Sequence, residues 1–405
     1  MLLTSEIEKA YNAQKAFLET KNTGIPRQYL ENFQPLFGHV DVISGIRRCG
    51  KSTLMYQIIK KFFRNVAYFN FEDSRVFGFE VGDFQKLDEI VGTGIEAYFF
   101  DEIQNIPSWE IFVRQLHDRG EKIYITGSNA SLLSRELGTR LTGRHLRHEL
   151  FPFSYAEFLT FSGKENHQES FDDFLTEGGF PEYLQAKNPE VLQNLLKDIV
   201  FRDIAVRYGV RNSRTLMDLA LFLISNIGKE VSYNGLKNFF EIGSANTVSD
   251  YLSWLEDAYL LFFLPKFSWS AKKSAVNPRK VYAIDNGLVK SNSLSFSNDR
   301  GRLLENLVFQ FLRQKNVKIY FFREKKECDF VVFSGGKCLT VIQVCDEITP
   351  DNKTREMAGL MEAIRFFELE KGLIITRQQE DKFIVEGKKI EIIPARQFLL
   401  AWEID

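Results

Sequence analysis

The 405-residue sequence predicts an α/β fold whose first part contains a parallel sheet. Residues 40–43 form a strand-like run, and a glycine-rich loop and a helix follow it directly. Two further segments have the length of strands and are each followed by polar residues: the apolar run 97–100 and residues 122–126. Strands that alternate with loops and helices in this way are typical of a parallel α/β sheet.

The loop after residue 44 matches the pattern G-x-x-x-x-G-K-[ST], which binds nucleotide phosphates. Its two glycines let backbone N–H groups close around the β- and γ-phosphates, and the helix that follows points its positive end at them. Lys51 is expected to neutralise phosphate charge, and Ser52 to offer its hydroxyl to Mg²⁺. The predicted nucleotide-binding residues are Gly45, Ile46, Arg47, Arg48, Cys49, Gly50, Lys51, Ser52 and Thr53.

The carboxylates that a magnesium nucleotide requires follow the strand of residues 97–100. Asp101 is predicted to hold the Mg²⁺ shell, and Glu102 to polarise the attacking water. The alternative is a buried strand followed by a solvated acidic turn. Because the phosphate loop is also present, we expect an ATP site that contains Mg²⁺.

Two more groups are candidates for contact with the γ-phosphate. Ser128 or Asn129, after the strand of residues 122–126, is predicted to sense the γ-phosphate or the lytic water, and the alternative is an ordinary turn. Arg144 is predicted to act as a finger on a neighbouring subunit's nucleotide, although exposed arginines are common and Arg135, Arg140 and Arg147 lie close by in sequence. The predicted catalytic residues are Glu102, Asp101, Lys51, Asn129, Ser128 and Arg144.

These motifs, with Leu-Phe-Pro-Phe-Ser-Tyr-Ala-Glu-Phe at 150–158 and Glu-Gly-Gly-Phe-Pro-Glu-Tyr at 177–183, resemble a large group of prokaryotic AAA-type ATPases. The resemblance implies a P-loop NTPase domain, a winged-helix module and a C-terminal α/β domain related to restriction-endonuclease-like folds. It also implies ATP binding and association with DNA. The predicted boundaries are 1–34 for an N-terminal helical segment, 35–185 for the ATPase domain, 186–298 for a helical linker and winged helix, and 299–405 for the nuclease-like domain.

The composition agrees with a cytoplasmic, multi-domain protein. Its hydrophobic content of 44% and charged content of 26% are ordinary for globular proteins. The longest apolar stretch, residues 258–264, is too short to span a bilayer, and the first residues lack the pattern of a secretion signal. The four cysteines include no C-x-x-C pair. We therefore expect neither membrane association nor a zinc site.

The net charge of −2 gives no overall field that would attract nucleic acid, so DNA contact requires a local basic face. Residues 216–227, 232–240 and 246–259 are predicted to form three helices in helix-turn-helix order. Residues 260–266 and 280–284 are predicted to pair as a hairpin, the wing, with a basic tip. The predicted DNA-binding residues are Asn246 and Thr247 on the third helix and Lys272, Lys273 and Lys280 on the wing.

The C-terminal part is predicted to begin with a helix near residue 301 and to continue as strands. The resemblance implies a metal site of the pattern Asp…Glu-x-Lys, which in this chain becomes Asp329…Gln343-Val-Cys345. An amide replaces the glutamate and a thiol replaces the lysine, although Lys325, Lys326 and Lys337 are nearby candidates for a migrated lysine. We therefore expect Glu305 and Asp329 to hold a metal only weakly and the domain not to cut DNA.

The predicted function is an ATPase that binds and hydrolyses Mg-ATP and acts as a DNA-associated molecular switch or motor. Its expected partners are duplex DNA and either further copies of the chain or another protein. Two alternatives remain open. In one, the C-terminal domain is a metal-dependent nuclease that ATP licenses. In the other, the chain is a protein-binding switch without DNA contact, which the acids Asp250, Glu256 and Asp257 on the third helix favour.

Overall fold

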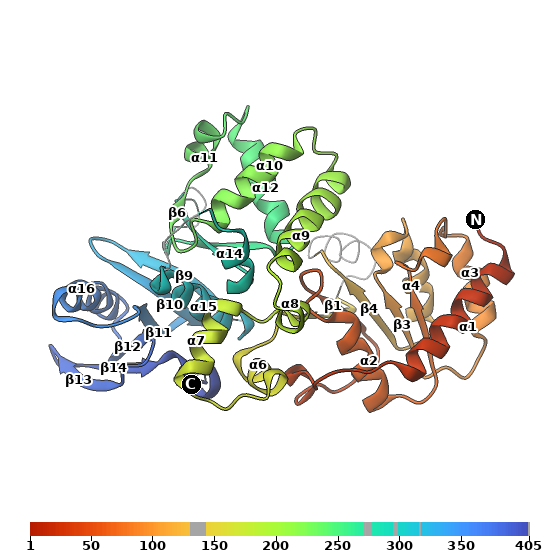
Figure 1. The fold of residues 1–405 in the computed structure, drawn as a ribbon, viewed down its shortest axis with the longest axis horizontal. Coiled ribbons are helices and arrows are strands. Elements are labelled where there is room, and N and C mark those ends of the chain that lie inside the picture. Colours follow the sequence, from red (N-terminus) through yellow and green to blue (C-terminus); the bar gives the residue numbers. More distant parts are fainter. Residues whose placement is uncertain (130–142, 271, 273–276, 295–298, 316, 404–405) are drawn as a thin grey trace. The chain divides into compact units, whose positions relative to one another are not determined.

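A five-stranded sheet forms the centre of the first compact unit of the chain, Met1–Phe151, and helices cover both of its faces (Figure 1). All of its strands are parallel. The predicted parallel α/β sheet is therefore confirmed. The strands are β1 (Val40–Ser44), β2 (Val66–Asn70), β3 (Ala97–Asp101), β4 (Ile123–Gly127) and β5 (His145–Glu149), in the spatial order β2-β3-β4-β1-β5.

The structure, a computed structural model, describes all residues except 130–142, 271, 273–276, 295–298, 316 and 404–405. Arg135, Arg140 and Lys273 from the sequence analysis lie outside the described residues. No helix in the described part of the chain is both long and apolar enough to cross a membrane.

The helices of the first unit pack on the sheet through apolar side chains. Ile7 and Tyr11 of the first helix join a core cluster with Phe69 of β2 and Trp109 of the fourth helix. The first helix is therefore part of the core of this unit. The helical elements are α1 (Thr4–Thr20), η1 (Gln28–Leu30), α2 (Lys51–Phe62), η2 (Ser74–Val76), α3 (Asp83–Val91), η3 (Ile103–Asn105) and α4 (Trp109–Asp118).

The second compact unit, Pro152–Asp405, begins with helices and a small three-stranded sheet. The predicted hairpin is confirmed, because Leu261 pairs with Ala283 and Pro265 with Arg279 in antiparallel register. The elements are α6 (Tyr155–Ser162), α7 (Gln168–Glu177), α8 (Pro181–Ala186), α9 (Glu190–Asp198), the π-helix η4 (Ile199–Val206), α10 (Ser213–Ile224), β6 (Glu230–Val231), α11 (Tyr233–Phe239), α12 (Ala245–Asp257), β7 (Leu261–Pro265), β8 (Arg279–Ala283) and α14 (Asn286–Asn292), with strand order β6-β8-β7.

The Glu-Gly-Gly-Phe-Pro motif holds α7 against α14. Asp285 caps α14 by accepting a hydrogen bond from Leu288 N, and it also accepts one from Gly179 N at 2.6 Å. Gly178 has a φ of +70°, and a Cβ at this position would lie 2.3 Å from the Asp285 carboxylate, so only glycine fits. Burial raises the pKa of Asp285 to about 6. The motif is thus explained by close packing around a buried carboxyl group.

A six-stranded mixed sheet forms the rest of the second unit (Figure 1). Its first three strands are antiparallel neighbours, and the positive φ of both Gly335 and Gly336 allows the tight turn between the second and the third. Leu360 and Ile364 of α16 pack on the sheet through Val331 and Val341. The elements are α15 (Arg300–Gln314), β9 (Lys318–Arg323), β10 (Glu327–Ser334), β11 (Lys337–Val344), α16 (Pro350–Phe366), β12 (Lys371–Thr376), β13 (Asp381–Val385), β14 (Lys388–Pro394) and α17 (Ala395–Ala401), with strand order β13-β14-β12-β11-β10-β9.

Candidate functional site

Strand β1 delivers the glycine-rich loop to the start of α2, as the sequence predicts. Gly50 is the cap residue of α2 and has a φ of +100°, so it takes the left-handed conformation that favours glycine. Since glycine has no side chain, it cannot accept the N–H groups of the first turn, which remain available to an anion. A Cβ on Gly45 would lie 2.2 Å from the Leu150 carbonyl oxygen, so this glycine lets the loop pack on the chain after β5.

Lys51 lies inside this loop and is 4% exposed. Its Nζ donates hydrogen bonds to the carbonyl oxygens of Gly45 and Ile46 at 3.2 Å, and it lies 3.6 Å from Glu102 Oε1. Burial acts to lower the pKa of Lys51, but the opposing charges, Glu102 first among them, raise it above the usual value. The ammonium group therefore stays charged, as contact with phosphate requires.

Asp101 ends β3 and is fully buried. Tyr68 donates its hydroxyl to Asp101 Oδ2 at 3.0 Å, and Thr126 donates to Oδ1. Burial raises the pKa of Asp101, and the nearby Glu102 adds to this rise, whereas hydrogen bonds from Thr126, Ser52 and Tyr68 oppose it. The structure thus brings Ser52 and Asp101, the two predicted Mg²⁺ ligands, into direct contact.

Thr126, at the end of β4, connects the two acids and was not predicted from the sequence. Its Oγ1 accepts a hydrogen bond from Glu102 N at 2.8 Å, and the same hydroxyl donates to Asp101. Strand β4 lies between β1 and β3, so its carboxyl end lies between the phosphate loop and the acids. Ser128 and Asn129 follow at this edge and are buried, and their role as sensors stays a prediction.

Arg144 lies at the other edge of the sheet. It precedes β5, and its carbonyl oxygen accepts a hydrogen bond from Val40 N at the amino end of β1. Its half-exposed guanidinium lies 3.2 Å from Asp118 Oδ1. Because the phosphate loop leaves the carboxyl end of β1, Arg144 does not join the site of its own chain. Its action on a neighbouring subunit's nucleotide stays a prediction.

Arg27 contacts the phosphate loop through its guanidinium group, and no sequence motif indicated this contact. The side chain is 4% exposed, and it donates to the carbonyl oxygens of Cys49 at 2.9 Å and Phe151 at 2.8 Å. Its backbone N–H donates to Gln57 Oε1 of α2. Cys49 itself is fully buried, and burial raises the pKa of its thiol, so this cysteine is shielded from alkylation.

We expect Arg27→Ala to weaken ATP binding roughly tenfold or more, because two buried carbonyl groups beside the loop lose their donor. Fluorescence titration with a labelled ATP analogue measures this change, and Arg64→Ala, at an exposed arginine of the same unit, is the matched control. Unchanged affinity in a folded Arg27→Ala protein would show that the guanidinium does not position the loop.

The residues at this edge fit a magnesium triphosphate. Lys51 and the first-turn N–H groups of α2 supply positive charge for phosphate oxygens. Ser52 and Asp101 supply a hydroxyl and a carboxylate, which are the hard oxygen ligands that Mg²⁺ prefers. Glu102 is the remaining carboxylate, and it is held by its backbone bond to Thr126 and by Gln104, which donates to Oε2.

A second charged cluster, the carboxylate pocket, lies in the second unit and consists of Lys280, Glu305, Glu327 and Asp329. Lys280 Nζ lies 2.9 Å from Glu305 Oε1, 2.8 Å from Glu327 Oε1 and 2.9 Å from Asp329 Oδ1. Burial raises the pKa of Glu305, and the Asp329 carboxylate adds to the rise against the effect of Lys280. Across the described ranges, no group of three or more His, Cys, Asp or Glu side chains is arranged for a metal ion.

This cluster corrects the prediction that Lys280 contacts DNA from a wing. Lys280 is 2% exposed, because its ammonium group meets three carboxylates in the interior, and the residues of β8 that follow it are buried as well. Glu305 and Asp329 do come together, but an ammonium group lies between them. The three candidates for a migrated lysine, Lys325, Lys326 and Lys337, are all exposed.

Gln343 and Cys345 lie on or just after β11 and have no charge to offer. Gln343 Nε2 donates to Glu356 Oε2 at 2.8 Å. Burial raises the pKa of the Cys345 thiol to about 12, and the nearby Glu356 and Asp329 add to the rise. The thiol is therefore protonated at neutral pH and brings no positive charge to this part of the domain.

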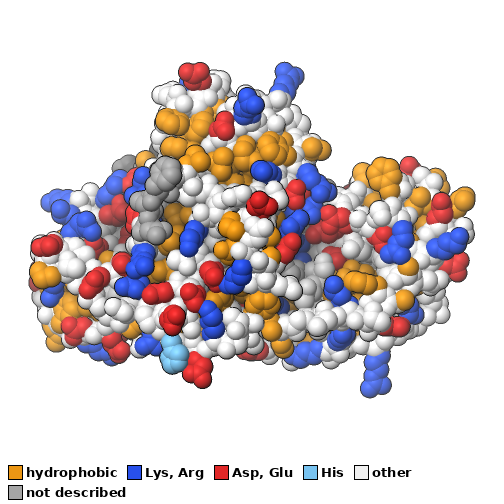
Figure 2. All heavy atoms as spheres, viewed as in Figure 1, with side chains coloured by type: hydrophobic (Ala, Val, Ile, Leu, Met, Phe, Trp, Pro, Cys, Tyr) orange, Lys and Arg blue, Asp and Glu red, His pale blue; other side chains and the backbone are white. Residues whose placement is uncertain are grey.

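The remaining predicted DNA-binding residues lie at the surface. Asn246 and Lys272 are exposed, whereas Thr247 is half-buried and hydrogen-bonds the cap residue Ser244 at 3.0 Å. The segment that follows β7 is packed at Phe267, whose ring stacks on Phe333 at a centroid distance of 5.2 Å. On the face shown in Figure 2, basic and acidic side chains are interspersed, so no large surface of one sign is visible.

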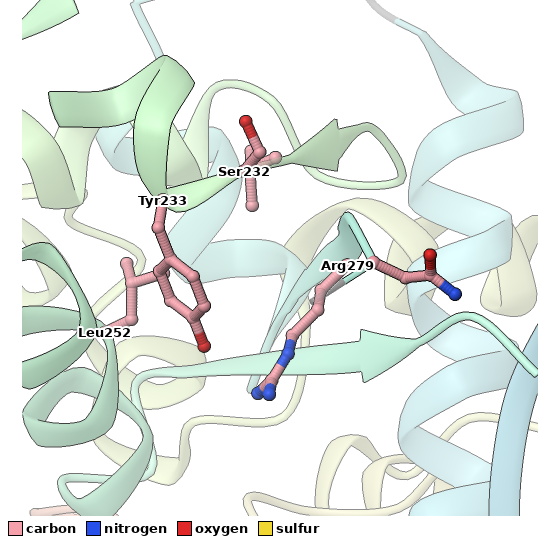
Figure 3. Close-up of a pocket in the computed structure, with 6 residues that line it drawn as sticks. Ser232, Tyr233, Leu252 and Arg279 are labelled. Atoms are coloured by element: carbon pink, nitrogen blue, oxygen red, sulfur yellow. The ribbon is translucent and has the colours of Figure 1, made fainter. Parts of the chain in front are cut away.

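A small pocket lies between β8, α11 and α12 (Figure 3). The Arg279 guanidinium lies 5.8 Å from the centroid of the Tyr233 ring, a cation–π contact that joins β8 to α11. The side chains that line the pocket come from Val231, Ser232, Tyr233, Leu252, Asn277 and Arg279.

Two parts of the sequence match known domain families. The chain matches the AAA domain family over residues 38–159 and a domain family of unknown function, DUF8612, over residues 168–299. The solved structure of the replication initiator DnaA bound to AMPPCP and single-stranded DNA is similar over 61% of this chain and 87% of that chain, with 16% identity and a TM-score of 0.30. A similarity this low carries no argument about function.

Two relatives are similar over most of their length. An uncharacterized protein of Haemophilus influenzae is 31% identical over 384 residues, which cover 89% of this chain and 94% of that relative. The uncharacterized protein MJ1544 of Methanocaldococcus jannaschii is 35% identical over 396 residues, which cover 90% of this chain and 88% of that relative. The chain therefore belongs to the same protein family as MJ1544, and its residues 38–159 form an AAA domain.

Proposed function

We propose that the chain binds and hydrolyses Mg-ATP and uses this cycle as a DNA-associated molecular switch or motor. The observation that supports ATP hydrolysis best is the convergence of Lys51, Ser52, Asp101 and Glu102 at the carboxyl edge of the parallel sheet. These side chains come from two separate strand ends, and together they supply a cation, two metal ligands and a base.

The proposed chemistry follows from these contacts. Lys51 exchanges its bonds to the loop carbonyl groups for phosphate oxygens, and Ser52 and Asp101 hold the Mg²⁺ that neutralises phosphate charge when it is bound. Glu102 orients the attacking water and accepts its proton. Arg144 of a neighbouring copy stabilises the charge of the transition state, which requires that copies of the chain assemble.

The order of elements supports the finer domain assignments. Strand order β6-β8-β7 with α10, α11 and α12 is the arrangement that a winged helix requires, with α12 as its recognition helix. The order α15, β9, β10, β11, α16, β12, with β11 parallel to β12, agrees with a restriction-endonuclease-like core. The loss of the glutamate and lysine at Gln343 and Cys345 leaves this core without nuclease chemistry.

The proposal predicts that duplex DNA changes the ATPase rate. We expect the double variant Asn246→Asp, Lys272→Glu to weaken duplex binding for any sequence and to flatten its salt dependence, because exposed residues beside phosphates carry no sequence information. Fluorescence anisotropy at several salt concentrations measures binding, and phosphate release measures the rate. The control Lys15→Glu reverses the charge of an exposed lysine in the first unit, as Lys272→Glu does in the second.

One observation favours the alternative of a protein-docking switch. Asp250 is exposed on α12, the same helix that carries Asn246, while Lys280 is withdrawn from the surface. An acid on a recognition helix repels phosphate and suits a basic partner protein. If duplex DNA neither binds nor changes the ATPase rate of the unaltered chain, the docking alternative replaces the DNA role, and the assignment of ATP hydrolysis is unaffected.

A further inference from the structure

We propose that Lys280 is the resident cation of the carboxylate pocket. Its ammonium group occupies the place between Glu305, Glu327 and Asp329 that a divalent metal would need, so the pocket does not take up a metal while Lys280 is present. This inference concerns the second unit and does not depend on the proposed ATP cycle.

The contact distances show that all three hydrogen-bond donors of the Lys280 ammonium group have acceptors. A lysine ammonium carries three protons and can donate three hydrogen bonds. Lys280 Nζ has three carboxylate oxygens at 2.8–2.9 Å, and each comes from a different residue. Every proton therefore has an anionic acceptor, which is the arrangement of a charge held in a fixed place rather than of a mobile surface lysine.

The ammonium group and two of its carboxylate partners are largely buried. The Lys280 side chain is 2% exposed, Asp329 is 7% exposed and Glu305 is 12% exposed, whereas Glu327 is 34% exposed and lies at the solvent side of the cluster. Water therefore cannot easily replace the ammonium between Glu305 and Asp329. Buried charges must be paired, and the loss of one partner is strongly destabilising. Three carboxylates held this close together require a cation, and the chain supplies it from β8.

The remaining acceptor sites of the carboxylates are also held. Tyr282, two residues after Lys280 on β8, donates its hydroxyl to Glu305 Oε1 at 2.6 Å. Val344 N donates to Asp329 Oδ2 at 2.9 Å. Arg323 lies 3.4 Å from Glu327 Oε2 and also pairs with Glu230. The acids are thus held by groups other than Lys280, and four carboxylates that face one ammonium and one guanidinium leave an excess of negative charge.

An excess of negative charge on fixed carboxylates is what a hard divalent cation binds. The ammonium blocks such a cation in two ways, because it fills the space and because it repels a second positive charge. If Lys280 loses its charge while its apolar stem remains, the pocket should become a site for Mn²⁺ or Mg²⁺. Gln343, on the neighbouring strand, would add no charge to this site.

The test is Mn²⁺ binding to nucleotide-free protein, measured by electron paramagnetic resonance of free Mn²⁺. We compare the unaltered chain, Lys280→Met, Lys280→Arg and the double variant Lys280→Met, Asp329→Asn. We expect Lys280→Met to gain one Mn²⁺ site roughly tenfold or more tighter than any binding by the unaltered chain. Lys280→Arg keeps the cation and should gain none, and the double variant should lose the new site.

Two results would overturn the inference. In one, the unaltered chain binds a stoichiometric Mn²⁺ that Asp329→Asn abolishes, which makes the pocket a metal site despite Lys280. In the other, Lys280→Met is folded but binds Mn²⁺ no better than the unaltered chain.

Thermal melting keeps the test valid where Lys280→Met is unstable. We expect Mn²⁺ to raise the melting temperature of Lys280→Met, and to leave that of the double variant and of Lys280→Arg unchanged. If Lys280→Met is unstable and Mn²⁺ does not stabilise it, the inference is contradicted, because the acids then do not bind a divalent cation.

Discussion

Replacement of Lys51 by alanine is expected to abolish ATP binding. Lys51 is the buried cation of the phosphate loop, and its Nζ already lies within hydrogen-bond distance of the loop carbonyl groups of Gly45 and Ile46. Without it, roughly three or four phosphate charges have only backbone N–H groups and Mg²⁺ as compensation. We expect the dissociation constant for ATP to rise about a hundredfold or more, as measured by titration with a fluorescent ATP analogue.

The matched control is Lys60→Ala, at an exposed lysine near the end of the same helix. This control should bind ATP as the unaltered chain does. Circular dichroism of both variants checks the fold. A folded Lys51→Ala protein with undiminished ATP affinity would remove the phosphate loop from the proposed site.

Glu102→Gln is expected to separate binding from turnover. The amide keeps the shape of the side chain but cannot accept a proton from water, so the hydrolysis rate should fall roughly 10²- to 10⁴-fold. Binding should persist or become tighter, because Lys51 loses a carboxylate 3.6 Å away that competes with phosphate for its charge. Rates of phosphate release at saturating ATP measure the first effect, and titration measures the second.

Glu89→Gln, which removes an exposed carboxylate from α3 of the same unit, is the control and should leave both quantities unchanged. If Glu102→Gln hydrolyses ATP at the parental rate, the base lies elsewhere, and the assignment of Glu102 is wrong. A simultaneous loss of binding would instead indicate that Glu102 holds the loop through Lys51.

The sequence predicted those parts of the site that depend on local chain order. The phosphate loop and the acids after residues 97–100 each follow a strand directly, so position along the chain already places them at a strand end. Thr126 and Arg27 could not be found in this way. Thr126 reaches both acids because β4 lies between β1 and β3, and this order of strands is not visible in the sequence. Arg27 reaches the phosphate loop because the chain folds back so that its guanidinium donates to the Cys49 carbonyl oxygen.

Lys280 shows where local reading gives the wrong answer. Its neighbours in sequence are basic, and a basic run between two strands suggests a wing. Lys280 and Tyr282 are two residues apart on β8 and therefore point to the same face, but residues 280–283 are all buried, so no alternation of exposed and buried residues marks that face. What was not visible is that Glu305, Glu327 and Asp329 fold onto that face, since they belong to α15 and β10.

The packing of the phosphate loop on Leu150 has a mechanical consequence. Cys49 Sγ lies 3.5 Å from the Leu150 carbonyl oxygen, and Arg27 bridges Cys49 to Phe151, which is the last residue of the first unit. The loop and the exit point of the chain are therefore clamped together by the same guanidinium. We therefore expect a displacement of the loop to be transmitted to the peptide that leads into the second unit, because Arg27 donates to one carbonyl group on each side.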